Sequence, residues 1–338
     1  MDPLAPPDPV ALLRALIDID STTGRETALA RWLGEDLRRR GWQVLEQRVD
    51  EDRFNLLATL DPPDVVFSTH LDCVPPFFGS RQQGDLIFGR GACDAKGCVA
   101  TQIVAADRLR RAGRRQVGLL FVVGEERGSD GARAANLLAA GSRYLVNGEP
   151  TDNLLGVATR GVLRVRLMAR GRASHSSCPE LGESAIEKLV DALVRLRSLE
   201  LPHDGVMGRT HYTVGTIAGG IAPNVVPPAA DAEVLFRTVG GAAEVARLKA
   251  SLATLEPAVA CEEIVEVPPV TLIGVPGFET AAFPYTTDIP FLDRWGQPLL
   301  LGPGSILVAH TDQEHVRVAD LHRAVDQYVA LAEHLLSR

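Results

Sequence analysis

The strongest constraint on the fold is an alternation of strand-like and helix-like segments in the first 150 residues. Strand-like runs at 65–69, 117–123 and 144–146 alternate with helical patterns at 96–111 and 130–140. Strands that are buried on both faces read as nearly continuous apolar runs, because helices cover both sides of a parallel sheet. The pattern therefore predicts an α/β fold with a mostly parallel sheet sandwiched by helices.

The alternation changes near Gly156. Residues 162–169 alternate apolar and polar side chains, which is typical of a half-exposed antiparallel strand. The elements that follow have the order β-α-β-β-α-β, a split βαβ unit that can fold alone. We therefore expect an inserted α+β domain at 158–270 that interrupts a discontinuous domain formed by 1–157 and 271–338.

Histidines and carboxylates recur where the predicted strands end. Ligands collect at the carboxyl ends of the strands in such sheets, and two histidines with several carboxylates suit zinc, cobalt or manganese. Each residue alone is weak evidence, but ligands at five separate strand ends predict a metal site by convergence. The candidate ligands are His70, Asp94, the Glu125-Glu126 pair, Glu149 and His310.

The Glu125-Glu126 pair and Asp72 are expected to have different roles at this site. Glu125 and Glu126 are adjacent, so their side chains cannot both point the same way, and one can bind metal while the other acts as a base. Asp72 follows His70 by two residues, where it can accept a hydrogen bond from the free imidazole N–H and fix its tautomer.

Charge and composition exclude several classes of function. The chain has 338 residues and a net charge of −8, without a large basic cluster, which argues against a nucleic-acid partner. It has no apolar stretch long enough to span a membrane and no signal-peptide pattern at its start, so we expect no membrane partner. The five cysteines show no C-x-x-C spacing and are expected to be reduced thiols of a cytoplasmic protein.

Several motifs resemble the co-catalytic zinc aminoacylase and carboxypeptidase family over essentially the whole chain. That family includes acetylornithine deacetylase, succinyl-diaminopimelate desuccinylase, aminoacylase and glutamate carboxypeptidase. The motifs are His70-Leu71-Asp72, Gly89-Arg90-Gly91-x-x-Asp94-x-Lys96-Gly97, Glu125-Glu126, Gly148-Glu149-Pro150-Thr151, and Gly302-Pro303-Gly304 with Ala309-His310.

The resemblance implies a role for each candidate residue in the first domain. Asp94 would bridge two metal ions, which would be Zn²⁺ first, with Co²⁺ or Mn²⁺ as alternatives. His70 and Glu149 would complete one site, while Glu126 and His310 would complete the other. The remaining roles would be Glu125 as the general base that activates a bridging water, Asp72 as the residue that orients His70, and Gly302 and Gly304 as substrate-binding residues.

The inserted domain carries the same resemblance. His175, within Gly171-x-x-x-His175-Ser176-Ser177, resembles a family histidine that reaches across a homodimer to polarise the scissile carbonyl. Asn224 resembles a substrate-contacting residue of that domain. Arg237 resembles the arginine that pairs with the substrate α-carboxylate, a task for which its planar fork of donors is suited.

The expected function is metal-dependent removal of an acetyl group from an N-acyl amino acid, with N-acetylornithine or a related acetylated basic amino acid first. The alternatives are a dipeptidase or glutamate-type carboxypeptidase, or succinyl-diaminopimelate desuccinylase, with the same metal pair. A third hypothesis is a non-enzymatic scaffold. The sequence argues against it, because every ligand position and the base position hold residues that can bind metal or act as a base. Two regions are shorter than in the family, 73–88 and 269–288, and both weaken any substrate assignment.

A few further residues lie close to the motifs. Glu314 follows His310 by four residues, and we expect at most a supporting role behind the ligands. Cys73, Cys93 and Cys98 are beside ligand positions and are expected to be small buried packing residues.

Overall fold

The computed structural model describes residues 7–138 and 141–338, which form two compact units. The first six residues of the expected first domain, and the last two of the helix expected at 130–140, lie outside this description. The first unit comprises 1–157, 272–281 and 287–338, and the second comprises 158–271 and 282–286. Residues 282–286, expected in the first domain, group with the second unit.

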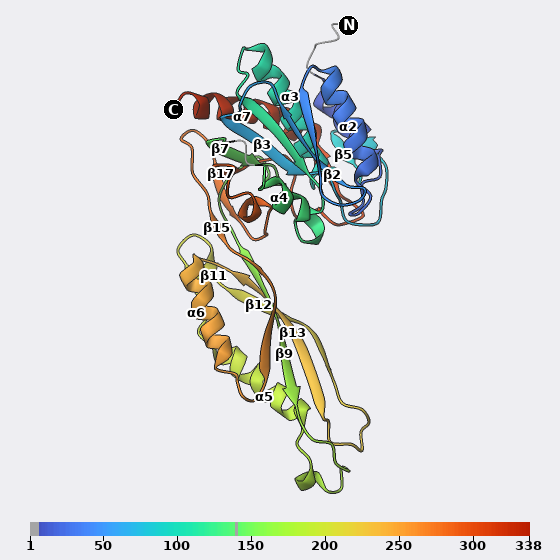
Figure 1. Ribbon diagram of the computed structural model, residues 1–338, viewed down its shortest axis with the longest axis vertical. Helices are drawn as coiled ribbons and strands as arrows, with labels where there is room; N and C mark the ends of the chain where they lie inside the picture. Colours follow the sequence, from blue (N-terminus) through green and yellow to red (C-terminus); the bar gives the residue numbers. More distant parts are fainter. Residues whose placement is uncertain (1–6, 139–140) are drawn as a thin grey trace. The chain divides into compact units, whose positions relative to one another are not determined.

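A six-stranded sheet forms the centre of the first unit, with the order β1-β2-β6-β3-β7-β17. The four strands from β6 to β17 are parallel, whereas β1 and β2 pair antiparallel at one edge. This arrangement confirms the expected mostly parallel α/β fold (Figure 1). The bounds are β1 Gln43–Arg48, β2 Phe54–Thr59, β3 Val65–His70, β6 Val117–Val122, β7 Tyr144–Asn147 and β17 Gln297–Leu300.

Helices cover both faces of this sheet, because each central strand sends alternate side chains to opposite sides. On one face, Phe67 and Phe121 join the core that also contains α1, α2, α3 and α7; on the other, Val66 and Leu120 pack with α4 and Trp295. The helix bounds are α1 Pro9–Ile17, α2 Thr27–Arg39, α3 Lys96–Arg111, α4 Asp130–Ala135 and α7 Val318–Leu336.

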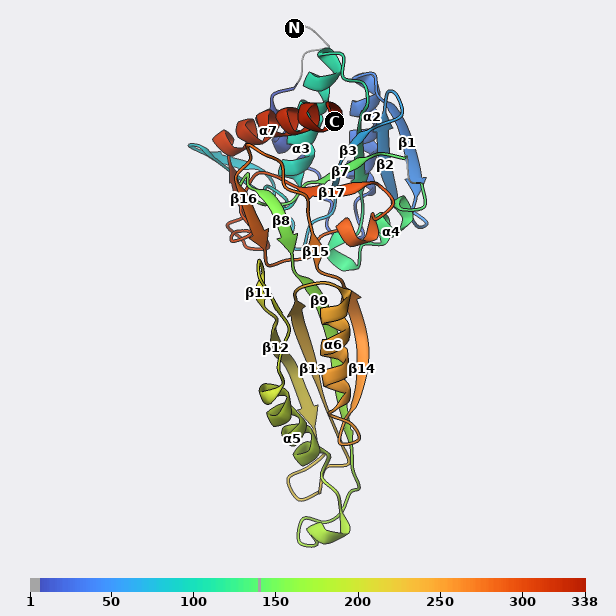
Figure 2. The same ribbon diagram turned by 90° about the vertical axis from the view of Figure 1, so that its left-hand side faces the viewer.

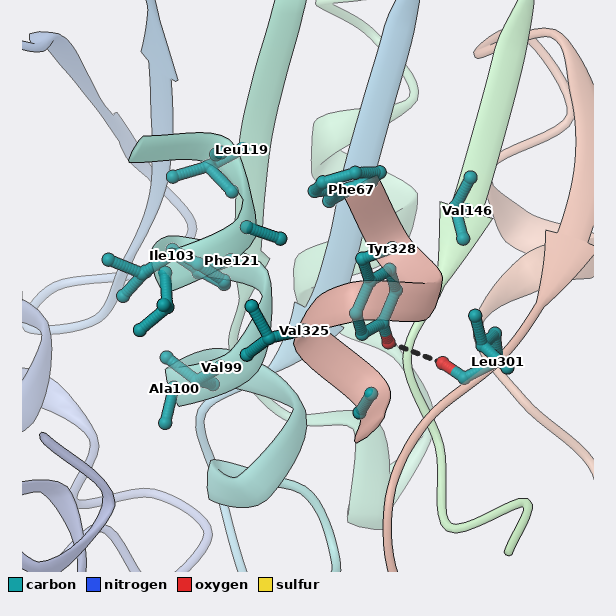
Figure 3. Packing of buried hydrophobic residues seen from close by; sticks show 14 of the residues in the cluster. Phe67, Val99, Ala100, Ile103, Leu119, Phe121, Val146, Leu301, Val325 and Tyr328 are labelled. Atoms are coloured by element: carbon teal, nitrogen blue, oxygen red, sulfur yellow. Dashed lines mark hydrogen bonds between the residues drawn. The ribbon is translucent and has the colours of Figure 1, made fainter. Parts of the chain in front are cut away.

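Tyr328 shows how the last helix is fixed to the sheet. Its ring lies 5.1 Å from that of Phe67, centroid to centroid. Its hydroxyl donates a hydrogen bond to the backbone carbonyl of Leu301, just after β17 (Figure 3). A buried tyrosine needs such a partner for its hydroxyl, so α7 is held close to the loop that leads to Gly302 and Gly304.

The second unit is a four-stranded antiparallel sheet, in the order β12-β13-β9-β14, with two helices on one face. Alternate side chains of β9 and β13 are buried beneath these helices, as the period-2 pattern predicts. Figure 2 shows the ribbon of this unit with its strands and the helices α5 and α6. The order of its main elements is the expected β-α-β-β-α-β. The bounds are β9 Gly161–Arg170, α5 Ala185–Ser198, β12 His211–Gly219, β13 Ala229–Thr238, α6 Ala242–Ala253 and β14 Ala260–Val267.

The remaining elements are short. They are the strands β4 Arg81–Gln83, β5 Leu86–Phe88, β8 Leu155–Thr159, β10 His203–Asp204, β11 Gly208–Arg209, β15 Val270–Thr271, β16 Thr280–Phe283 and β18 His315–Arg317, with 3-10 turns at Glu125–Arg127, Pro179–Leu181 and Ile289–Phe291. In the part of the chain that the structure describes, no helix is long and apolar enough to cross a membrane.

Candidate metal centre

The candidate ligands gather at the carboxyl edge of the parallel sheet in the first unit. His70 is the last residue of β3, and Glu125-Glu126 and Glu149 follow the ends of β6 and β7. Asp94 lies immediately before the N-terminus of α3, and His310 lies in the loop after β17.

His70, Asp94 and Glu149 form a first ligand group, whose ligand atoms lie within 4.8 Å of one another. His70 Nε2 is 3.1 Å from Asp94 Oδ1 and 3.8 Å from Glu149 Oε2. All three side chains are buried. The other imidazole nitrogen, Nδ1, donates to the backbone carbonyl of Asp72 at 3.0 Å, which leaves Nε2 to face the carboxylates.

Asp94, Glu126 and His310 form a second group of the same compactness. His310 Nε2 lies 3.0 Å from Glu126 Oε1 and 3.2 Å from Asp94 Oδ2. Asp94 thus presents one carboxylate oxygen to each group. This is the arrangement that a carboxylate bridging two cations requires.

The residues present fit two divalent cations. Each group offers one imidazole nitrogen and two carboxylates, a donor set that suits zinc, cobalt or manganese. Glu149 Oε1 is buried and has no hydrogen-bond partner among the described residues. An acceptor left unpaired in a buried site is costly unless something binds it, and a cation would remove this cost.

The pKa values of the candidate ligands reflect the same crowding. Burial alone would lower the pKa of His70, but hydrogen bonds to the surrounding carboxylates raise it well above the ordinary 6.5. Hydrogen bonds to Asp94 and Glu126 raise the pKa of His310 to about 10. Burial raises the pKa of Glu149 to about 7. Metal ligands must be neutral imidazoles and ionised carboxylates, so metal ions and protons would compete for these residues.

Glu125 and Glu126 lie on a 3-10 turn that begins directly after Gly124. Gly124 has a φ of +75°, and a Cβ at this position would lie 1.9 Å from Asp130 Oδ1, so only glycine fits. Among the described residues neither ligand group includes Glu125. Burial raises the pKa of Glu125 well above 4.5, opposed by His70 and reinforced by the carboxylate of Asp288.

Asp72 is fully buried, and its carboxylate fixes the position of this turn. It accepts the backbone N–H groups of Glu125 at 3.0 Å and Glu126 at 3.1 Å. It also accepts the hydroxyl of Thr23 at 3.0 Å, and Asp72 Oδ1 lies 3.5 Å from His70 Nδ1. Neither ligand group among the described residues contains Asp72.

Gly302 and Gly304 are buried and pack against the segments that carry two of the candidate ligands. A Cβ on Gly302 would meet the backbone oxygen of Glu149 at 2.4 Å, and one on Gly304 would meet Cys93 Cβ at 2.5 Å. Both glycines therefore allow the loop after β17 to pack closely against the segments that carry Glu149 and Asp94. Their expected role in substrate binding stays a prediction.

The three residues expected to contact substrate from the inserted domain lie in the second unit. His175 is exposed and pairs with Val225 in an isolated antiparallel bridge, and Asn224 accepts the backbone N–H of Ser176 through its carbonyl at 3.0 Å. Arg237 lies near the C-terminal end of β13, directly opposite His211 on β12.

Arg237 belongs to a small group of basic side chains with Arg160 and His211, which we call the cationic group because of its two guanidinium ions. Burial and the neighbouring Arg160 lower the pKa of the Arg237 guanidinium, and burial and the two arginines lower that of His211 below 6.5. Within 7–138 and 141–338, no carboxylate forms an ion pair with any of the three. Such a group is suited to bind an anion that is not part of the protein.

Sequence analysis missed two residues close to the ligands. Asp288 is fully buried, burial raises its pKa to about 7, and neither of its carboxylate oxygens has a hydrogen-bond partner in the described part of the chain. Thr23 donates to Asp72 from 49 residues away in sequence. Neither Asp288 nor Thr23 has a local sequence pattern that distinguishes it from other carboxylates or hydroxyls.

The cysteines beside the ligands are buried and free. Burial raises the pKa of Cys73 to about 11 and the pKa values of Cys93 and Cys98 well above 9.0. They are therefore neutral thiols at neutral pH, in keeping with packing roles.

Comparison with curated proteins identifies relatives over nearly the whole chain. A probable carboxypeptidase of Aspergillus clavatus is 37% identical over 370 residues, which cover 96% of this chain and 82% of the relative. A peptidase M20 domain-containing protein of Schizosaccharomyces pombe is 38% identical over 331 residues, covering 94% of this chain and 82% of the relative.

Solved structures share the fold at lower identity. A tripeptidase from Staphylococcus aureus superposes with a TM-score of 0.83 at 18% identity, covering 98% of both chains. A dinuclear metal-binding peptidase of the M20 family from Bacillus subtilis gives a TM-score of 0.74 at 17% identity, covering 97% of this chain and 98% of that one.

The model of the peptidase family M20/M25/M40 matches residues 66–334. These residues include both ligand groups, Glu125 and the second unit. The acetylornithine deacetylase branch of the expected family is not distinguished from its peptidase branches by these matches. The chain is a member of the peptidase family M20/M25/M40, whose members are metal-dependent hydrolases of amide bonds.

Proposed function

We propose that this protein hydrolyses an amide bond whose nitrogen belongs to an amino acid with a free α-carboxylate. The observation that carries the proposal is the pair of ligand groups that share Asp94, with Glu125 beside them and in neither group. A base adjacent to two cations is what hydrolysis of an unactivated amide needs.

Two dications held by these groups would polarise the scissile carbonyl and lower the pKa of a water molecule. Glu125 removes a proton from the attacking water and delivers it to the leaving amine. Asp72 keeps Glu125 in place through the backbone N–H group of that residue. His70 Nδ1 is hydrogen-bonded to the backbone carbonyl of Asp72, so Nε2 would be the imidazole nitrogen that is available to bind a cation.

Arg237 binds the α-carboxylate of the substrate in this proposal. It has no acidic partner among the described residues, and the guanidinium of Arg160 adds positive potential beside it. A guanidinium that is partly desolvated and unpaired gains most from a bidentate carboxylate.

The protein acts as a homodimer in this proposal, with His175 supplied by the partner subunit. Ala229 at the start of β13 pairs with Arg170, and Arg237 near its other end pairs with Val162. At about 3.3 Å per residue, the strand between Ala229 and Arg237 spans roughly 26 Å. His175 lies beyond the Ala229 end, so His175 and Arg237 of one chain cannot contact one amino-acid-sized substrate.

The exposed face for such a dimer is the edge strand β12 with the outer side of α5. Among the described strands, β12 pairs only with β13, and its side chains are almost all exposed. An open edge with apolar side chains is normally covered by another chain. The apolar residues exposed here are Val190, Val194, Val214 and Ile217.

Two substrate classes share this chemistry. The first is the C-terminal residue of a short peptide, which the names of the relatives at 37% identity support. The second is an N-acetylated basic amino acid such as N-acetylornithine, which the sequence around 302–305 and 309–311 favours by resemblance. Zn²⁺ is the proposed metal in both cases, and the five free cysteines support a reducing compartment such as the cytoplasm.

A substrate panel tests the proposal. N-blocked dipeptides, the same dipeptides with a C-terminal amide, N-acetylornithine and succinyl-diaminopimelate are incubated with enzyme loaded with Zn²⁺, Co²⁺ or Mn²⁺. Turnover is expected only for substrates with a free α-carboxylate, and Glu125→Gln should abolish it. Equal turnover of the amidated peptides, or full activity of Glu125→Gln, would contradict the proposal. Turnover of N-acetylornithine but not of peptides would decide for the second class.

A further inference from the structure

The side chain of Glu314 is completely buried and contacts the backbone of the bridging ligand. Glu314 Oε1 accepts the N–H of Asp94 at 3.2 Å and the N–H of Cys93 at 3.3 Å. Glu314 Oε2 accepts a hydrogen bond from Arg90 at 2.6 Å. The backbone carbonyl of Glu314 accepts the N–H of Gly89 at 3.2 Å, so both ends of the segment 89–94 are attached to one residue.

Arg90 is buried as well and extends this network. Its Nε donates to the carbonyl of Pro76 at 3.2 Å, and its guanidinium lies 5.0 Å from the centre of the Phe78 ring. A buried ion pair with hydrogen bonds on both partners contributes little net stability compared with apolar residues, because desolvation offsets the attraction. Its presence here therefore calls for a reason other than stability.

The network connects two ligands that are distant in sequence. Asp94 is the last residue of the segment 89–94 that Glu314 contacts, and His310 precedes Glu314 by only four residues. His310 has a φ of +62°, which is strained for a residue with a side chain and persists only where the surrounding structure enforces it. The segment between His310 and Glu314 is short, and Gln313 N–H donates to Thr311 Oγ1 within it at 3.2 Å.

The two ligand groups depend on this network to different degrees. Asp94 and His310 are two of the three ligands of the second group, and both are placed by segments that Glu314 joins. In the first group, His70 and Glu149 come from strand ends that Glu314 does not contact among the described residues. A change at Glu314 therefore acts on the second group most directly.

We propose that Glu314 is a positioning residue for the metal ion of the second ligand group. It sets the placement of Asp94 relative to His310 and so determines the affinity of the second group for metal. Arg90 holds the Glu314 carboxylate in the orientation that receives both N–H groups. The inference rests on the dinuclear site of the proposed function and assigns Glu314 more than the supporting role expected from the sequence.

Stepwise metal binding to the full-length protein tests the inference. Metal-free protein is titrated with Co²⁺, followed by its visible spectrum, and with Zn²⁺ in competition with a chromophoric chelator. Glu314→Gln must place its NH₂ either against Arg90 or against the two N–H groups, so one set of donors loses its acceptor. We expect the binding step that fills the second group to weaken by roughly 10- to 100-fold and its Co²⁺ spectrum to change, while the step that fills the first group shifts far less.

Asp107→Asn is the matched control. Asp107 is a buried carboxylate of the same unit that accepts Trp42 Nε1 at 3.1 Å and pairs with Arg40 and Arg110, and it contacts none of the ligands. The Asp107→Asn variant should be less stable than the wild type, with the same metal affinity in both binding steps. Circular dichroism at each titration point verifies that all variants are folded.

A double variant covers the case in which Glu314→Gln does not fold. Arg90→Leu combined with Glu314→Leu leaves no unpaired buried charge, yet removes the acceptor of the Asp94 N–H. This double variant should show the same selective weakening of metal binding to the second group. Two unchanged steps in a folded Glu314 variant would overturn the inference and leave the proposed function intact. Wild-type protein that binds no metal would instead refute the proposed function.

Discussion

The carboxylate of Asp72 accepts the backbone N–H of Glu125 at 3.0 Å, and this contact joins the end of β3 to the turn after β6. Asp72 also accepts the N–H of Glu126, so a single side chain places both the candidate base and one candidate ligand. Its contact with the His70 ring is longer, 3.5 Å to Nδ1. Orientation of the histidine, the role implied by the family, is therefore only part of what this carboxylate does.

Replacement of Asp72 by asparagine should lower kcat and metal affinity together. The amide would turn one donor toward the N–H of Glu125 or Glu126, and the imidazole would lose a charged neighbour. We expect each quantity to fall by roughly 10- to 100-fold, measured by initial rates and by metal titration. Thr23→Val removes only one of the hydrogen bonds to Asp72 and should cost about 1 kcal/mol of unfolding free energy in urea. An Asp72→Asn variant with unchanged kcat would show that the turn is held by other contacts.

His211 should titrate below the ordinary 6.5 and report on the cationic group. Burial, Arg160 and Arg237 all favour its neutral form. Because its folded pKa is lowered, the unfolded chain binds more protons between that pKa and 6.5, and the stability contributed by His211 falls as pH falls through this window. Arg237→Ala should raise the His211 pKa toward 6.5, and binding of an amino-acid product with its α-carboxylate should raise it in the wild type. Imidazole resonances in an NMR titration measure both shifts.

The NMR titration of His211 tests whether Arg237 binds the substrate carboxylate. Its result is independent of whether the metal centre hydrolyses amide bonds. If a carboxylate product leaves the His211 pKa unchanged while inhibiting the enzyme, the product binds elsewhere. Arg237→Lys is the matched control, because it keeps the charge near His211 but loses the planar fork.

Removal of the metals should destabilise the first unit and leave the second unchanged. Both ligand groups found among the described residues belong to the first unit. A ligand at about 1,000 times its Kd stabilises the folded state by about 4 kcal/mol, and the buried carboxylates repel one another once the cations are gone. Hydrogen exchange after chelation should therefore accelerate in β3 and β6 but not in β9 and β13. Equal acceleration in both units would contradict this assignment of the metals.

The sequence predicted the parallel sheet and the candidate ligands because both follow from local patterns. Apolar runs in the sequence indicate buried strands, and the carboxyl ends of parallel strands lie at one edge of the sheet for any loop conformation. His70 and Glu149 could therefore be predicted to lie close together. The contacts of Glu314 and Thr23 could not be predicted in this way. They join residues 220 and 49 positions apart, and no periodic pattern in the sequence encodes such pairs. The same holds for 282–286, which group with the second unit and contact it where the N–H of Arg160 donates to the carbonyl of Phe283 at 3.1 Å.

A mixture of two inactive variants should recover activity if His175 acts across a dimer. His175→Ala lacks the histidine that each subunit offers its partner, and Glu125→Gln lacks the base. In a mixed dimer, the subunit with an intact Glu125 receives His175 from the Glu125→Gln partner and forms one working site. Random re-association of equal amounts should therefore restore about a quarter of the wild-type rate.

The mixing experiment needs a control for dimer formation. Ile217→Lys places a charge on the exposed edge strand β12, where Ile217 is 60% exposed, and should yield monomers by light scattering. Monomers with an intact Glu125 and His175 should then be inactive. Full activity in monomers, or no recovery in mixed dimers whose exchange is verified by native mass spectrometry, would mean that each chain uses its own His175.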